Sequence, residues 1–148
     1  FNEEVRINVT GIKDLEFVTA PLTARKYGSF ILQPLDGALF VPDRLLLQLG
    51  QFPASEGRTA KLLVIVDEKN MTDSFRITEI EADPPFMTAT LKPLGVPTGT
   101  VHRYTLEISV PPGRPRIRKT DSDRGHMKVG TNHPSGETIF TDVLVHSY

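Results

Sequence analysis

The stretch RYTLEISV, residues 103–110, alternates strictly between polar and apolar side chains. This period of two is typical of a β-strand with one face in a core and the other in water. Its apolar face consists of Tyr104, Leu106, Ile108 and Val110. The run KLLVIV, residues 61–66, is apolar in both phases and indicates a central strand. We therefore predict one shared core, to which the other strands contribute Leu62, Val64, Phe75 and Ile77.

Further runs on both sides have the composition of strands. They are residues 4–10, 86–91, 127–131 and 138–146. The run 75–82 changes phase, because Phe75 and Ile77 share one phase and Ile80 falls in the other. A β-bulge near Thr78 to Ile80 explains such a change within one strand.

Helical patterns are scarce in this chain. No window of about 12 residues repeats apolar side chains at helical spacing, and the best candidate, residues 43–48, is short. The 12 prolines and 11 glycines concentrate between the strand runs, where turns are needed. About seven or more short strands between frequent turns favour a β-sandwich or a β-barrel.

Composition excludes several classes of function. The 148 residues, 39% of them hydrophobic, suffice for one domain with a substantial core. The 17 Lys and Arg balance 18 Asp and Glu, so neither nucleic acid nor an anionic membrane is expected as a partner. No apolar run approaches the roughly 20 residues of a membrane helix, so no membrane insertion is expected. Cysteine is absent, which excludes disulfides and thiolate chemistry.

Three segments from Leu39 onward carry a family resemblance. The first runs from Val41-Pro42 through Leu45, Leu47, Leu49-Gly50 and Phe52 to Gly57. The second is Phe75-Arg76-Ile77. The third is Val129 to Pro134, followed by residues 138–145. In order and spacing they resemble a family of uncharacterised bacterial immunoglobulin-like domains. That family is similar to hydin-type (ASH) domains and, more distantly, to major sperm protein and PapD-like sandwiches. The chain departs from the usual pattern at Leu49, where an aromatic residue is common, and at His133, where aspartate is common.

The resemblance implies an all-β, immunoglobulin-like sandwich of about seven to nine antiparallel strands. Related domains often occur in tandem on exported or envelope proteins. The expected location is therefore the periplasm, the cell envelope or the outside of the cell, with any signal peptide lying outside this sequence. The resemblance supplies no catalytic residues.

The domain is predicted to span residues 38–148. Residues 1–37 are interpreted as an N-terminal strand, read as the end of a preceding repeat, and a linker-like segment with one short strand at Phe30-Ile31-Leu32. A strand over Glu4 to Thr10 would expose unpaired backbone groups and one apolar face. We expect it to add to a sheet of the domain or, as the alternative, to pair with a second chain.

Candidate reactive groups do not converge in the sequence. The four histidines, at 102, 126, 133 and 146, lack the spacing of a preformed metal site. Carboxylates cluster at Asp67-Glu68, at Glu79-Glu81-Asp83 and at Asp121-Asp123. They are interpreted as solvated faces and turns, because a calcium loop would need further ligands and a distal Glu. No catalytic, cofactor-binding or metal-binding residue is assigned.

Arg114 to Lys119 is the one basic run. It lacks interleaved aromatic residues for base stacking and is followed at once by Asp121. A solvated loop, or an edge strand protected by charge, is the favoured interpretation.

These observations support a non-catalytic protein-interaction or spacer module of an exported bacterial multi-domain protein, with neighbouring immunoglobulin-like repeats in the same chain. Binding would use loops or a free sheet edge. One alternative is an accessory domain with a carbohydrate-type ligand site near His102, Tyr104 or residues 79–83. Another is PapD-like peptide chaperoning, which requires an exposed edge strand and a basic anchor within Arg114 to Lys119.

Overall fold

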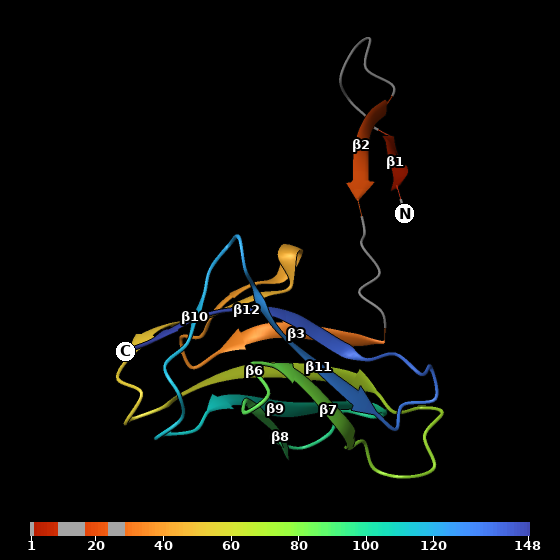
Figure 1. Cartoon of the computed structure of the whole chain (residues 1–148). Coiled ribbons are helices and arrows are strands. Elements are labelled where there is room, and N and C mark those ends of the chain that lie inside the picture. The colour runs from red at the N-terminus through yellow and green to blue at the C-terminus, as the bar shows by residue number, and fades with distance from the viewer. Residues whose placement is uncertain (1, 9–16, 24–28) are drawn as a thin grey trace.

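The computed structural model describes residues 2–8, 17–23 and 29–148, and its larger part is a two-layer β-sandwich (Figure 1). One layer is a four-stranded antiparallel sheet in the order β3-β6-β9-β8. Its strands are β3 (Phe30–Leu35), β6 (Arg58–Asp67), β8 (Thr88–Pro93) and β9 (Val101–Val110). The alternating stretch 103–110 thus lies in β9, and the run 61–66 lies in β6, a central strand as predicted.

The second layer is a six-stranded mixed sheet in the order β4-β5-β12-β11-β7, with β10 also pairing with β12. Its strands are β4 (Leu39–Val41), β5 (Leu46–Phe52), β7 (Ile77–Asp83), β10 (Arg118–Lys119), β11 (Gly125–Thr131) and β12 (Ile139–Ser147). Because β5 and β12 run parallel, the expectation of antiparallel strands throughout is wrong for this pair. The two strands are far apart in the chain, so no hairpin dictates their direction.

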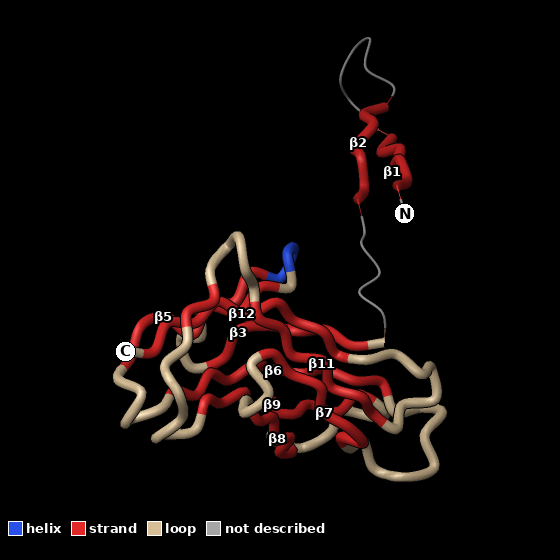
Figure 2. The backbone as a smooth tube through the Cα atoms, in the orientation of Figure 1, coloured by secondary structure: helices blue, strands red, loops and turns tan. Residues whose placement is uncertain are grey.

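Helical structure is minimal in the described residues (Figure 2). The one helical element among them is a 3-10 turn, η1 (Pro42–Arg44), and the short helix considered for residues 43–48 is replaced by this turn and the start of β5. No helix in the described part of the chain is long and apolar enough to cross a membrane.

The core lies between the two layers and contains the predicted set. Leu62, Val64, Leu106 and Ile108 are fully buried, and Phe75, Tyr104 and Val110 are nearly so, while Ile77 is partly buried against them. Leu63 and Ile65, on the opposite face of β6, are half-buried. The apolar character of β6 in both phases therefore does not mean that both of its faces lie in a core.

Two irregularities in the second sheet have local causes. In β7, Ile77 pairs with Thr131 and Glu79 with Gly130, which leaves Thr78 without a partner residue and confirms the predicted bulge. In β5, the register against β12 shifts by one residue before Gly50. The positive φ of Gly50, 73°, is a conformation that glycine adopts without steric cost.

The N-terminal residues differ from the expectations in two ways. The strand predicted over Glu4 to Thr10 is present as β1 (Asn2–Asn8), with residues 9 and 10 outside the described part. It pairs with β2 (Phe17–Thr23), in a segment interpreted as connection, and the two form a separate two-stranded sheet. The expected addition of β1 to a sheet of the domain is therefore not what the structure shows.

The sandwich also begins before the predicted boundary at residue 38. β3 pairs with β6 over six residues, from Phe30 opposite Val66 to Leu35 opposite Lys61. The strand continues through Pro34 because proline is tolerated on an edge strand, where its missing N–H costs no ladder hydrogen bond.

Candidate functional site

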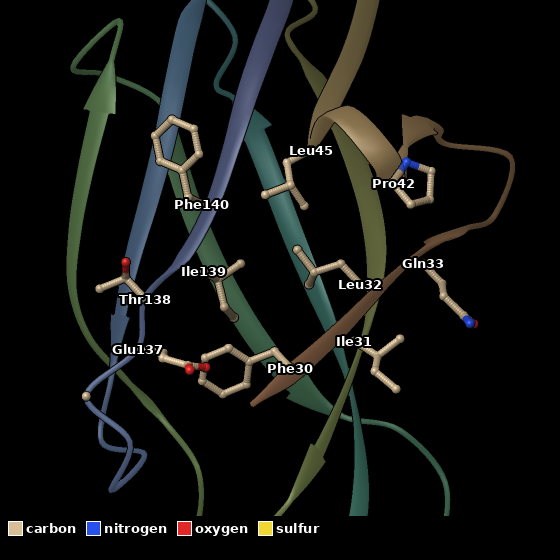
Figure 3. A pocket seen from close by; sticks show the side chains of 11 residues that line it. Phe30, Ile31, Leu32, Gln33, Pro42, Leu45, Glu137, Thr138, Ile139 and Phe140 are labelled. Atoms are coloured by element: carbon tan, nitrogen blue, oxygen red, sulfur yellow. The ribbon is translucent and has the colours of Figure 1, made fainter. Parts of the chain in front are cut away.

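An apolar groove opens between the two layers beside β3, with a cavity volume of about 620 Å³ (Figure 3). One wall is β3 itself, and the opposite wall is the start of β12 together with the turn that follows β4. The apolar side chains that line it are Phe30, Ile31, Leu32, Leu45, Ile139 and Phe140. Glu137 is the one charged residue among the lining residues that the structure describes.

The groove exists because one strand position in the second layer is empty. β5 pairs with β12 from Asp142 onward, and no described strand lies on that side of Ile139 and Phe140. Upstream of β5, the chain leaves the sheet plane at Leu45, which has a positive φ of 47° and follows the η1 turn. Leu45 and Pro42 therefore line the gap where a further strand would continue the sheet.

Backbone polar groups of β12 point into this gap. Asp142 donates its N–H to the carbonyl of Leu45 (2.8 Å), so Asp142 faces the β5 side. Backbone groups alternate sides along a strand, and Phe140, two residues earlier, therefore presents its N–H and C=O to the same side.

The same reasoning applies to β3. Glu68, just after β6, donates its N–H to the carbonyl of Thr100 (2.8 Å). The backbone N–H and C=O groups of even-numbered residues in β6 therefore point toward β9, and those of odd-numbered residues point toward β3. Gln33 lies opposite the odd-numbered Leu63 and is thus hydrogen-bonded to β6. Leu32 consequently directs its N–H and C=O to the free edge, as does the carbonyl of Pro34.

The β3 edge also differs in charge from the other edges of the described sandwich. The sequence of β3, FILQPL, contains no charged residue. β7 carries three acidic residues, β8 ends in Lys-Pro and β10 is Arg-Lys, while uncharged β4 has only three residues. Charged side chains on edge strands oppose pairing with other chains, so β3 is the least protected edge of useful length.

One end of the groove is held together by contacts across the layers. The Ser29 N–H donates a hydrogen bond to the Glu137 carboxylate, which links the start of β3 to the start of β12. The Phe30 ring contacts Phe75 and His133, with centroid distances of 5.5 Å and 5.4 Å. These contacts fix β3 against the loop that precedes β12.

A second, more polar pocket of about 500 Å³ opens on the opposite side of the sandwich, between β7 and β8. His102 and Tyr104 line it, at the site that the sequence analysis named for a ligand-binding alternative. The Glu68 side chain, 10% exposed, accepts a hydrogen bond from the Tyr104 hydroxyl and lies 3.2 Å from His102 Nδ1. Burial and this hydrogen bond raise the pKa of Tyr104 above its ordinary value.

The other three histidines each contact a different aromatic side chain. His126 stacks on Phe140, His133 contacts Phe30, and His146 contacts Tyr148. No group of three or more residues able to hold a metal ion occurs in the described part of the chain.

Most of the clustered carboxylates form ion pairs across the surface. Glu81 pairs with Lys128 at 3.3 Å, and Asp83 pairs with Lys119 at 2.8 Å. Asp121 pairs with Arg124 at 3.1 Å, and Asp123 pairs with Lys119 at 3.3 Å. The resulting hydrogen bond with Asp83 raises the pKa of Lys119. This arrangement agrees with the interpretation as solvated faces and turns for the clusters at 79–83 and 121–123, whereas Glu68 is largely buried.

The basic run Arg114 to Lys119 is partly loop and partly edge strand, the two structures that the sequence predicts for it. Residues 114–117 are loop, and Arg118 and Lys119 form the short edge strand β10 opposite His146 and Val145. The groove lies at the other end of β12, around residues 137–140. The described groove lining contains no Lys or Arg, so the anchor that PapD-like chaperoning requires is not next to the free edge.

Sequence reasoning missed the groove because the short strand predicted at residues 30–32 was assigned to a linker-like segment outside the domain. The sequence does contain a signal for this free edge, because a proline such as Pro34 inside a mostly apolar, uncharged strand is typical of an edge strand. Comparison with known proteins adds no assignment: no family model, no curated protein and no solved structure matches the chain.

Proposed function

We propose that this chain is a non-catalytic protein-interaction module that holds an extended segment of another protein in the groove between β3 and β12. The observation that carries the proposal is the apolar groove of about 620 Å³ with an uncharged free strand edge on one wall. Binding sites for protein segments are concave and mostly apolar, with a few polar groups that fix orientation. The likeness to envelope-associated sandwich domains supports a place in the periplasm, in the envelope or outside the cell.

The test is selection from a library of displayed random peptides against the folded chain, with the contact surface mapped by amide chemical shifts. Selected peptides are expected to perturb β3 and residues 137–140. Ile31→Asp should abolish their binding, because it places a charge on the groove wall. Ile80→Asp is the matched control, since Ile80 is 43% exposed on the edge strand β7 and Ile31 is 48% exposed on β3. Failure to select any peptide, or equal loss in both variants, would contradict the proposal.

A second candidate function rests on the pocket between β7 and β8. Its one specific support is that His102 and Tyr104 line it and that Glu68 holds both side chains. The pocket offers a carbohydrate few aromatic faces, because the chain has no Trp and only three Tyr. Titration with a panel of oligosaccharides tests it: amide shifts at the lining residues Thr90 and Leu91 that are lost in His102→Ala would favour this function, and absence of shifts would exclude it.

A further inference from the structure

We infer that the groove binds its partner by antiparallel β-strand addition to β3, so that the partner ends at the Phe30 end, and that the partner is an uncharged, alternately apolar segment followed by a basic residue. This inference rests on the proposed function and names the class of segment that the groove accepts.

Leu32 provides the pairing groups. Its N–H and C=O point away from β6 and have no described strand beside them, so an added strand can bond to both. Pro34 lacks an N–H, and pairing therefore weakens beyond it toward Leu35. The added segment is thus short and centred on Leu32.

The shape of the groove determines the side chains of the segment. In an added strand, every second side chain points toward the second layer, where Leu45 and Ile139 line the cavity. These positions must be apolar, whereas the intervening side chains lie beside Ile31 and Gln33, next to solvent. A cavity of about 620 Å³ is of a size that holds a short segment, whereas the edge strand of a second sandwich carries its own sheet.

The charge at the groove determines the flanking residue. Glu137 lies at the Phe30 end, where its Oε2 accepts the Ser29 N–H and its Oε1 is not engaged by any contact of the described residues. No described cation lines the groove to oppose a basic side chain. A lysine or arginine next to the apolar positions complements this carboxylate.

The test uses an acetylated and amidated hexapeptide in which valine and threonine alternate and the last residue is lysine, titrated by amide chemical shifts. Leu32→Pro removes the outward N–H without removing a bond to β6, in the manner of the natural Pro34, and Leu32→Ala is the matched control that keeps the N–H. Leu32→Pro should bind at least about 10-fold more weakly than Leu32→Ala. A peptide with N-methylated valines tests the same bonds from the other side, should Leu32→Pro fail to fold.

The outcomes separate this inference from the proposed function. If displayed peptides bind the groove but Leu32→Pro and N-methylation have no effect, strand addition is wrong and the proposed function stands. If no peptide binds at all, the proposed function fails. Equal affinity for the hexapeptide and for its glutamate-ended analogue would overturn the basic preference. A dimer of the free chain that Leu32→Pro dissociates would assign the edge to a second copy and overturn the inference.

Discussion

Phe30→Ala tests whether β3 belongs to the sandwich. The Phe30 side chain is 7% exposed, and its ring lies 5.5 Å from that of Phe75 between centroids. Truncation of a buried Phe to Ala costs about 3–5 kcal/mol. We expect the lower end, about 3 kcal/mol, because Phe30 lines the groove and water can enter the space that the ring leaves.

The assay is urea unfolding followed by circular dichroism, since the chain has no Trp to serve as a fluorescent probe. With a slope of about 2 kcal/mol per molar urea for a chain of this size, the loss lowers the unfolding midpoint by about 1.5 M. Ile31→Ala is the control on the same strand. Its side chain is 48% exposed, and we expect a cost of about 1 kcal/mol and a midpoint shift of about 0.5 M.

Equal shifts for the two variants, or no shift for Phe30→Ala, would refute the placement of β3 in the core. That result would instead support the domain start predicted at residue 38. A chain shortened to residues 38–148 lacks β3 and is expected to lose at least as much stability as Phe30→Ala.

Three further predictions use the same unfolding measurement. Leu106→Ala should cost about 2–5 kcal/mol because the side chain is fully buried, whereas Glu107→Ala should leave the midpoint near that of the wild type; equal effects would contradict the alternation in β9. Gly57→Ala should lower the midpoint, because φ is +69° and the added Cβ would lie 2.5 Å from the carbonyl of Val110; an unchanged midpoint would show that this turn can relax. The folded state raises the pKa of Tyr104, so the protonated hydroxyl stabilises the fold fully below the unfolded pKa of about 10. This contribution is lost as the pH rises toward the folded pKa. The wild-type midpoint should therefore fall more steeply above pH ~10 than that of Tyr104→Phe. Parallel curves for the two proteins would argue against this contribution.

Local patterns in the sequence predicted much of the strand content. The alternation in residues 103–110 identifies the buried face of β9, and the phase change between Ile77 and Ile80 predicts the bulge that the structure places at Thr78. Both features are readable because side chains of a strand alternate between faces with a period of two, and this period is a property of consecutive residues.

What only the tertiary structure decided is which strands lie side by side. The parallel pairing of β5 with β12 and the pairing of β3 with β6 join segments that are distant in the chain. Glu68 and Tyr104 meet across 36 positions, and Ser29 meets Glu137 across 108. The groove forms where the chain leaves the sheet at Leu45 and a free edge faces the gap. Burial of apolar surface between two sheets selects these neighbours, and since that burial is a sum over the whole fold, no stretch of sequence determines it alone.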